Sequence, residues 1–355
     1  MDVPALAWLL TGAAVVGLIV FDFFAHVRTP HEPTFRESAW WSTVYIALAL
    51  VFGVVVGVVW GWEHGGEYFA GYVTEKSLSV DNLFVFLIVM TRFAVPRAFQ
   101  QKVLLVGVAI ALVLRTVFIL LGAAAIEQWS WVFYVFGAYL VYTGWKLARD
   151  AGSHDGDPTA TEGATEGATG GNGILVRTVR RVFPTTDEYH GDRLTTRVDG
   201  RRLLTPMLLV MVAIGSTDVL FALDSIPAIY GLTQEPYLVF TANAFALLGL
   251  RQLYFLIGGL LERLVYLSHG LAVILGFIGV KLVLHAMHHN ELPFVNGGEP
   301  VGWAPEIPIW LSLTVILGTL AVATVASLLR TRQDRAAAVQ PLTRTGVTPA
   351  RDEQE

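Results

Sequence analysis

Four acidic residues lie inside two long apolar segments of the chain, and their spacing is the same in both. Glu75 and Asp81 stand in one segment, Asp218 and Asp224 stand in the other, and the two acids of each pair are six residues apart. An acidic side chain at the middle of a bilayer costs about 2.5–3.5 kcal/mol, whereas each Leu or Val returns only about 0.3–0.6 kcal/mol. Acids in such segments therefore indicate a function that needs them.

Neutral oxygen donors accompany these acids. Ser77 and Asn82 share the first segment, and Ser225 follows Asp224 in the second. Carboxylate, hydroxyl and amide oxygens are the ligands that hard divalent cations such as Mn²⁺, Mg²⁺ and Ca²⁺ prefer. We therefore predict a metal site whose ligands are Glu75, Asp81, Asn82, Asp218 and Asp224. The residues that would support it are Ser77, Ser225, Arg115, Arg251 and Asp22.

The helical period does not bring the two acids of one segment together. Six residues along an α-helix turn the chain through about 600°, so Glu75 and Asp81 would point about 120° apart. Convergence needs local unwinding. Pro227 has no backbone N–H, which frees the carbonyl of Leu223 beside Asp224, and we expect the second segment to unwind there. In the first segment the serines and Asn82 compete with regular helical hydrogen bonds.

A structural role for the acids is the main alternative to metal binding. Lys76, Arg115 and Arg251 could neutralise them in buried ion pairs that fix the packing of the helices. Buried pairs seldom stabilise a fold, and acids inside a membrane more often mark an ion path or a proton relay. The two interpretations are compatible if the arginines hold the vacant site and release it when a cation arrives.

Two other polar residues in the apolar segments are more ambiguous. Asp22, near the end of the first apolar segment, either lines the path or reaches to the membrane surface. Asn243 is a lone polar residue, and such residues more often make hydrogen bonds between helices than bind ligands.

The composition is that of a polytopic membrane protein. Of the 355 residues 54% are hydrophobic and 15% are charged, against about a quarter charged in soluble domains. The net charge of -5 is spread over loops and tails, so nucleic acid is not expected as a partner. The absence of cysteine excludes disulfides and thiolate metal sites. No GxxxxGK[ST] segment is present, and the aspartates match no catalytic motif, so we expect neither an ATPase, nor an intramembrane hydrolase, nor any resident cofactor.

Nine apolar windows predict an all-α fold with nine transmembrane helices. Lys and Arg concentrate in alternate connections, which places the N-terminus outside and the C-terminus in the cytoplasm. We expect the first window to be a retained span rather than a cleaved signal peptide. The windows are 5–25, 42–61, 68–91, 103–123, 129–148, 205–230, 237–258, 264–285 and 308–330.

The windows divide the chain into four parts. Residues 1–149 and 205–330 form the membrane domain, and residues 331–355 read as a disordered cytoplasmic tail. The cytoplasmic loop 150–204 contains a flexible tether with the repeat TATEGATEGATGG, a short basic amphipathic helix and a small hairpin around Asp199-Gly200.

An internal repeat relates residues 68–148 to residues 205–285. Arg115, Glu127 and Lys146 follow the first acid pair, and Arg251, Glu262 and Lys281 follow the second. The separation from Arg to Glu is twelve and eleven residues, and that from Arg to Lys is thirty-one and thirty. Each copy holds three spans, so the second copy enters the membrane from the opposite side. The sequence therefore predicts a three-plus-three inverted-topology repeat of the transporter type.

The two acidic segments resemble the signature motifs of the TerC/Alx family of integral membrane proteins. The matching stretches are EKSLSVDNLF at 75–84 and TDVLFALDSIPA at 217–228, and the resemblance covers the chain from the first span to the ninth. It implies a bacterial inner-membrane protein of the lysine-exporter-like group, linked to tellurium resistance by name and to manganese export and metal homeostasis by function. It also implies that the acids of the two motifs bind the metal.

One position departs from the family pattern. Many members carry a glutamate three residues before the aspartate that corresponds to Asp218, where this chain has Gly215. Either the site holds one fewer carboxylate here, or that glutamate is not a ligand.

From these patterns we expect an exporter of divalent cations, foremost Mn²⁺, that works by alternating access and exchanges the metal for H⁺. The alternative from another class is a membrane scaffold with structural acids. It would dock soluble stress-response or metal-resistance (tellurite) partners through the basic loop. The oligomeric state and the coupling ion are not fixed by the sequence.

Overall fold

In this computed structural model the described residues are 1–27, 33–129, 131–152, 181, 184–186, 188–189, 191, 193–198, 201–257, 266–288, 290, 292, 296 and 299–338. Within these ranges a few side chains, that of Asp81 among them, are not described. Most of the predicted tether and amphipathic helix, and the tail beyond residue 338, lie outside the described residues.

The described chain is almost entirely helical. Its helices are α1 (Ala5–Asp22), which continues into the π-helical turn η1 (Phe23–Val27), α2 (Phe35–Trp60), α3 (Trp62–Arg92), α4 (Arg97–Gln128), α5 (Val132–Gly152), α7 (Pro206–Tyr230), α8 (Pro236–Leu248), α9 (Leu250–Ile257), α10 (Leu267–His288) and α11 (Ile309–Ala338). Two short strands, β1 (Thr195–Val198) and β2 (Arg201–Leu204), precede α7.

Seven helical segments of the described chain are long and apolar enough to cross a membrane. They lie in α1, α2, α4, α7, the α8–α9 segment, α10 and α11. The polytopic all-α membrane fold is thus confirmed. Helices α3 and α5 lie outside this set of seven; α3 carries Glu75, Lys76 and Asp81 in its middle, which lowers its hydropathy. The count of nine spans therefore stays a prediction.

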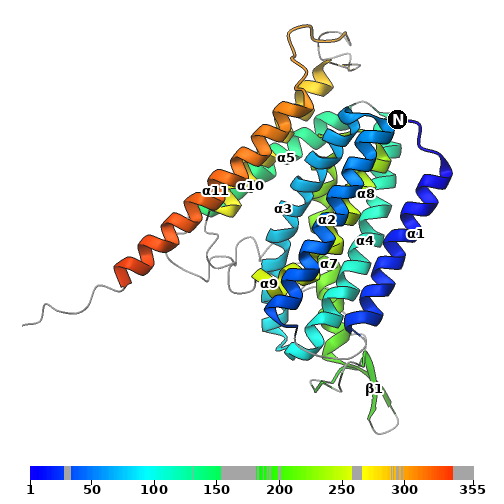
Figure 1. The fold of residues 1–355 in the computed structure, drawn as a ribbon, viewed down its shortest axis with the longest axis vertical. Helices are drawn as coiled ribbons and strands as arrows, with labels where there is room; N and C mark the ends of the chain where they lie inside the picture. Colours follow the sequence, from blue (N-terminus) through cyan, green and yellow to red (C-terminus); the bar gives the residue numbers. More distant parts are fainter. Residues whose placement is uncertain are drawn as a thin grey trace, which may run out of the picture.

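The helices form a bundle from which a smaller group leans away. Figure 1 shows α1, α2, α3, α4, α7 and α8 running alongside one another, while α5, α10 and α11 point outward together. In the bundle α3 packs against α2, α7 and α8, and α4 packs against α7 and α8. Helix α3 is therefore central, since three other helices of the bundle surround it. A single residue, Gly61 with a φ of 106°, separates α2 from α3, and this backbone conformation favours glycine.

Two predictions about helix breaks are wrong. Helix α3 runs without interruption past Glu75, and α7 runs without interruption through Pro227. The break lies instead at Gly249, between α8 and α9, in a segment that the sequence predicted to be one span. Because α3 and α7 are continuous, the acids of each pair lie on different helical faces, as the six-residue spacing requires.

Helices α5 and α10 cross at glycines with their backbones in contact. A Cβ atom on Gly279 would lie 2.8 Å from the carbonyl oxygen of Gly137, and one on Gly144 would lie 2.9 Å from that of Ala272. Small residues allow such close approach between helices in membranes. Because the nearest atoms are backbone atoms, a side chain at Gly279 or Gly144 would push the two helices apart.

A hairpin occupies the segment for which the sequence predicted one. Strands β1 and β2 are antiparallel, with Thr195 opposite Leu204. Nearby, the Tyr189 hydroxyl donates a hydrogen bond of 2.7 Å to the carbonyl of Phe93, just after α3. Burial raises the pKa of Tyr189, so its hydroxyl keeps the proton that this bond needs. The connection between α5 and α7 is thereby attached to the end of α3.

Candidate cation site

Two acids from different helices meet at one arginine in the centre of the bundle. The Arg115 guanidinium on α4 contacts the Glu75 carboxylate on α3, and its Nη2 lies 3.4 Å from Oδ1 of Asp218 on α7. Arg115 and Glu75 have no exposed surface, and Asp218 has 1%. Two carboxylates and one guanidinium leave one formal negative charge in a fully buried place. Such a charge is costly unless a cation or a proton joins it.

A polar layer between two apolar layers holds Arg115 and Asp218. Arg115 lies one helical turn from Ala111 on one side and from Ile119 on the other, on the same face of α4. Ala111 belongs to an apolar cluster of α3, α4, α7, α8 and α9 residues, whereas Ile119 belongs to a second cluster formed mainly by α7 residues. Asp218 has the same position on α7. It lies one turn from Ile214, which belongs to the first cluster, and one turn from Ala222, which belongs to the second.

Asn82 and Ser77 of α3 lie near this layer in different ways. The oxygen and nitrogen of the Asn82 amide both find partners when the amide is turned so that the two atoms exchange places. In this orientation Oδ1 accepts a hydrogen bond from Arg115 Nη2 at 3.2 Å, and the nitrogen donates to the Leu78 carbonyl at 3.1 Å. Ser77 donates to the carbonyl of Val73 in its own helix at 2.7 Å, and the lone pairs of its oxygen are not used by this bond. Asn82 therefore joins the acids, and a supporting role for Ser77 stays a prediction.

Several buried oxygens around the acids have no hydrogen-bond partner among the described residues. They are Asp218 Oδ2, Thr74 Oγ1, Ser79 Oγ and Ser225 Oγ. Buried polar groups are nearly always hydrogen-bonded, so a set of unpartnered oxygens at one place is typical of a ligand-binding position. Within the described part of the chain, no group of three or more His, Cys, Asp or Glu gathers that could hold a metal. A cation here would thus rely on two carboxylates and on neutral oxygens.

Asp224 lies apart from the other acids and faces α5. Its hydrogen-bonding neighbours are Tyr139 and Thr143, and the charge of Lys146 acts on it. Asp224 therefore lies by the leaning helices, whereas Asp218 lies in the bundle. Asp81, the remaining acid of the predicted set, has a side chain outside the described residues.

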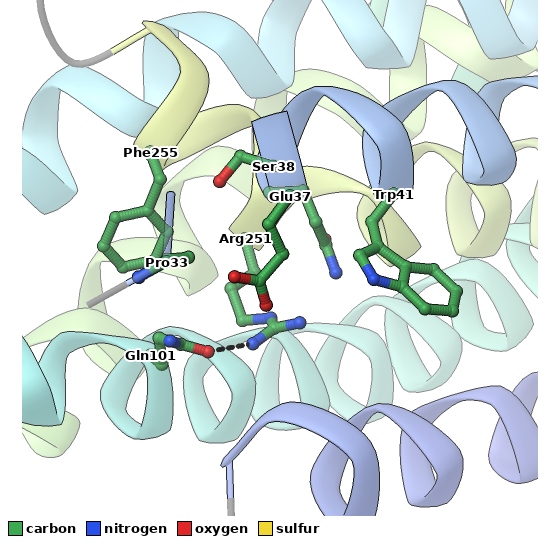
Figure 2. Close-up of a pocket in the computed structure, with 8 residues that line it drawn as sticks. Pro33, Glu37, Ser38, Trp41, Gln101, Arg251 and Phe255 are labelled. Carbon is green, nitrogen blue, oxygen red and sulfur yellow. Dashed lines mark hydrogen bonds between the residues drawn. The ribbon is translucent and has the colours of Figure 1, made fainter. Parts of the chain in front are cut away.

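Asp22 and Arg251 form a second buried ionic cluster. Oδ1 of Asp22 accepts hydrogen bonds from Arg251 Nη2 at 2.7 Å, from the Tyr45 hydroxyl at 3.1 Å and from Gln252 Nε2 at 3.2 Å. Arg251 also donates to Gln101 of α4, as Figure 2 shows. Asp22 is 6% exposed, so its carboxylate is enclosed by these protein donors and not by solvent.

This second cluster borders a small cavity. The cavity measures about 10 Å³, at the lower limit for one water molecule. Figure 2 shows Glu37 pointing toward Arg251 at its wall. Arg115 and Arg251, which the predicted repeat pairs with each other, have different contacts. Arg115 contacts Glu75 and Asp218, whereas Arg251 is held by Asp22.

Lys76 contacts a backbone carbonyl. Its Nζ donates a hydrogen bond of 3.0 Å to the carbonyl of Ala246, in the last turn of α8 before the break at Gly249. The last carbonyls of a helix lack partners within the helix, so the ammonium satisfies one of them. The sequence suggested that Lys76 pairs with the acids, because it did not predict the break between α8 and α9. The signal for that break in the sequence is Gly249, which lies inside an apolar run.

Comparisons with known proteins give one family and a set of membrane-protein relatives. The family model described as "Integral membrane protein TerC family" matches residues 60–335. An uncharacterized membrane protein of Mycobacterium tuberculosis is 50% identical over 327 residues, 92% of this chain and 80% of the relative. The "Putative membrane-bound redox modulator Alx" of Escherichia coli K12 is 38% identical, over 82% of this chain and 84% of the relative. No solved structure matches the chain.

Proposed function

Because the chain belongs to the TerC family of integral membrane proteins, we propose that it is a transporter that exports divalent metal cations, foremost Mn²⁺. The proposed site is centred on Glu75 and Asp218. Asn82 lies beside them, and Asp81 and Asp224 complete the set of ligands in other states of the transport cycle.

The observation that carries this proposal is the pairing of two fully buried acids with a single arginine. Glu75 and Asp218 come from α3 and α7, and one oxygen of Asp218 has no hydrogen-bond partner among the described residues. The second carboxylate here is matched by no other cation among the described contacts, which favours a site that accepts a mobile one.

Arg115 acts in this proposal as a resident cation. It holds Glu75 and Asp218 together while the site contains no metal, and it moves away when a divalent ion enters. Since carboxylates bind protons as well as metals, protons entering from the opposite side can return the site to its first state. Exchange of the metal for H⁺ is therefore the natural coupling.

Two inverted repeats and nine spans provide the architecture for alternating access. In the proposed repeat α3 corresponds to α7, and α4 corresponds to α8. The packing of α3 on α8 then has its counterpart in the packing of α7 on α4, and both pairs are in contact. The α5–α10 crossing supports the same relation. Gly144 and Gly279 occupy equivalent places in the two copies, and so do Gly137 and Ala272, seven residues earlier in each. Contact of Gly137 with Gly279 is thus repeated by contact of Ala272 with Gly144.

We place this protein in the bacterial inner membrane with its N-terminus outside and its C-terminus in the cytoplasm. The name of the Alx relatives suggests a redox role for those proteins. This chain contains no cysteine, so thiol–disulfide exchange by its own residues is excluded. A scaffold that docks soluble partners through residues 174–204 remains the rival. Deletion of 150–200 should abolish the function of a scaffold and should leave most of the cation flux of an exporter.

Uptake of Mn²⁺ into inverted membrane vesicles tests the proposal. Glu75→Gln and Asp218→Asn should each abolish uptake, and Asp81→Asn and Asp224→Asn test the remaining acids. Glu188→Gln is the matched control, because Glu188 is an exposed acid in the connection before α7. Uptake that persists at the wild-type rate in both Glu75→Gln and Asp218→Asn would remove these acids from any transport mechanism.

A further inference from the structure

Asn243 of α8 is buried without any hydrogen bond. Its exposed fraction is 0%, and neither its amide oxygen nor its amide nitrogen has a partner among the described residues. The sequence suggested a hydrogen bond between helices for this residue, and the described structure contains none. An amide that gives up its water and gains nothing in return is destabilising, so it calls for a ligand.

The neighbours of Asn243 on its own helix show where it faces. Val239, one turn before it, packs with Ile119 of α4 and with Ala222 of α7. Leu247, one turn after it, packs in the cluster that contains Ala111 and Ile214. Residues four apart share a helical face, so Asn243 faces α4 and α7 between these two apolar layers.

Arg115 and Asp218 occupy the corresponding place on their own helices. Arg115 lies one turn from Ala111 and from Ile119, and Asp218 lies one turn from Ile214 and from Ala222. The three polar residues therefore form one layer, bounded by the same two apolar clusters.

Contacts between α8 and α3 place Asn243 at the depth of Glu75 as well. A Cβ atom on Gly71 of α3 would lie 3.3 Å from that of Ala242, and Lys76 donates to the carbonyl of Ala246. Residues 242–246 of α8 thus run beside residues 71–76 of α3, and Glu75 falls within this stretch.

We propose that Asn243 is a neutral ligand of the transported cation, supplying its amide oxygen to the site centred on Glu75 and Asp218. This inference rests on the proposed function and goes beyond it, because it assigns a specificity-determining residue on a third helix. The amide adds a coordinating oxygen without adding charge. Hard cations such as Mn²⁺ and Mg²⁺ accept such an oxygen, whereas softer ions prefer nitrogen or sulfur.

This ligand bears on the family position at which the chain carries Gly215. A Cβ atom on Gly215 would lie 3.3 Å from Ile110 on α4. Position 215 therefore faces α4, about one helical turn before Asp218 on α7. Because the residue there is glycine, this position gives the site no carboxylate. With Asn243 in the layer the site regains an oxygen donor, and its formal charge remains that of two acids and Arg115.

Calorimetric titration of the purified full-length protein with MnCl₂, and separately with MgCl₂ and ZnCl₂, tests the inference. Asn243→Leu should weaken Mn²⁺ binding by about tenfold or more, since losing even a group that only supports a ligand costs about 10–100-fold. Asn243→Asp should bind Mn²⁺ more tightly than wild type, because it replaces a neutral oxygen with a charged one. Thr241→Val is the matched control: Thr241 is equally buried on the same helix, but its hydroxyl already donates to the Tyr237 carbonyl.

The outcomes separate this inference from the proposed function. If wild type binds Mn²⁺ and Asn243→Leu binds it equally well, Asn243 is not a ligand, and the exporter proposal stands. If wild type binds no divalent cation, both proposals fall. Should Asn243→Leu not fold, Asn243→Asp decides: tighter binding supports the assignment, and unchanged binding overturns it. A role in packing alone would lower the unfolding temperature of both Asn243 variants and leave their metal affinity unchanged.

Discussion

The Arg115 guanidinium contacts the Glu75 carboxylate inside the bundle, and neither side chain has any exposed surface. With Asp218 on the other side of the guanidinium, one cation is shared by acids from two helices that are far apart in the sequence. The contact is at once structural and functional in our proposal: it holds α3, α4 and α7 together while no metal is bound, and it must open for a metal to enter.

Replacement of the arginine should make stability depend on metal. Arg115→Gln leaves Glu75 and Asp218 buried without a cation, which should cost about 3–5 kcal/mol. A divalent ion can replace the missing charge, so MnCl₂ should raise the unfolding temperature of Arg115→Gln by more than that of wild type. Thermal unfolding in detergent, with and without MnCl₂, measures both effects. Equal stabilisation of the two proteins would contradict a resident-cation role for Arg115.

The cluster around Asp22 should contribute to stability but not to metal affinity. Asp22→Asn keeps oxygen for the hydrogen bonds of Tyr45 and Gln252 but leaves Arg251 without its carboxylate. Breaking a buried pair in this way should lower the free energy of unfolding by about 3 kcal/mol. The affinity for Mn²⁺ in a calorimetric titration should remain at the wild-type value. A drop in affinity together with stability would instead return Asp22 to the cation site.

The apolar windows predicted most of the fold because their signal is local. The membrane class, the hairpin of β1 and β2 and most span positions needed only hydropathy and turn chemistry. The break at Gly249 was missed because an apolar run hides a helix end, where one contact, from Lys76 to the Ala246 carbonyl, becomes possible. The periodicity of a sequence predicts which residues share a face of a helix. It does not predict which other helix packs against that face.

The candidate site was only partly predictable for the same reason. Glu75, Asn82, Asp218 and Arg115 were singled out by residue type, and the structure brings them together. Asp224 faces α5, because an unbroken α7 turns it away from Asp218. The repeat also suggested equal roles for Arg115 and Arg251. It could not foresee that Asp22 of α1, which lies outside both repeats, would hold the second arginine.

Tyr189 should contribute stability that is lost in alkali. Its hydroxyl donates to the Phe93 carbonyl, and Tyr189→Phe removes this bond at a cost of about 0.5–1.5 kcal/mol. Burial raises the pKa of Tyr189 above its ordinary value of 10.0 in the folded state. The unfolded chain therefore releases this proton first as the pH rises, and wild type loses stability that the Phe variant never had. The difference in unfolding temperature should be constant below about pH 10 and shrink above it, and a difference that grows would refute the assignment.

The α5–α10 crossing offers a test of packing with a control three residues away on the same helix. A Cβ atom on Gly279 would meet the Gly137 carbonyl oxygen at 2.8 Å and the Val141 nitrogen at 2.8 Å, whereas one on Gly276 would meet nothing within 4 Å. A side chain could relieve such a clash by changing its rotamer, but backbone atoms cannot. Gly279→Ala must therefore separate the two helices.

We expect Gly279→Ala to lower the free energy of unfolding by about 1–3 kcal/mol, the usual cost of overpacking. Gly276→Ala should match wild type or exceed it slightly, since alanine favours the helix. Chemical unfolding of both variants in detergent compares them directly. Glu75 and Asp218 lie on α3 and α7 and take no part in this crossing. Folded Gly279→Ala should therefore keep the Mn²⁺ affinity that these two acids provide. Its transport rate should fall if the proposed repeats move about this crossing. Equal stability of the two variants would mean that the helices do not approach this closely.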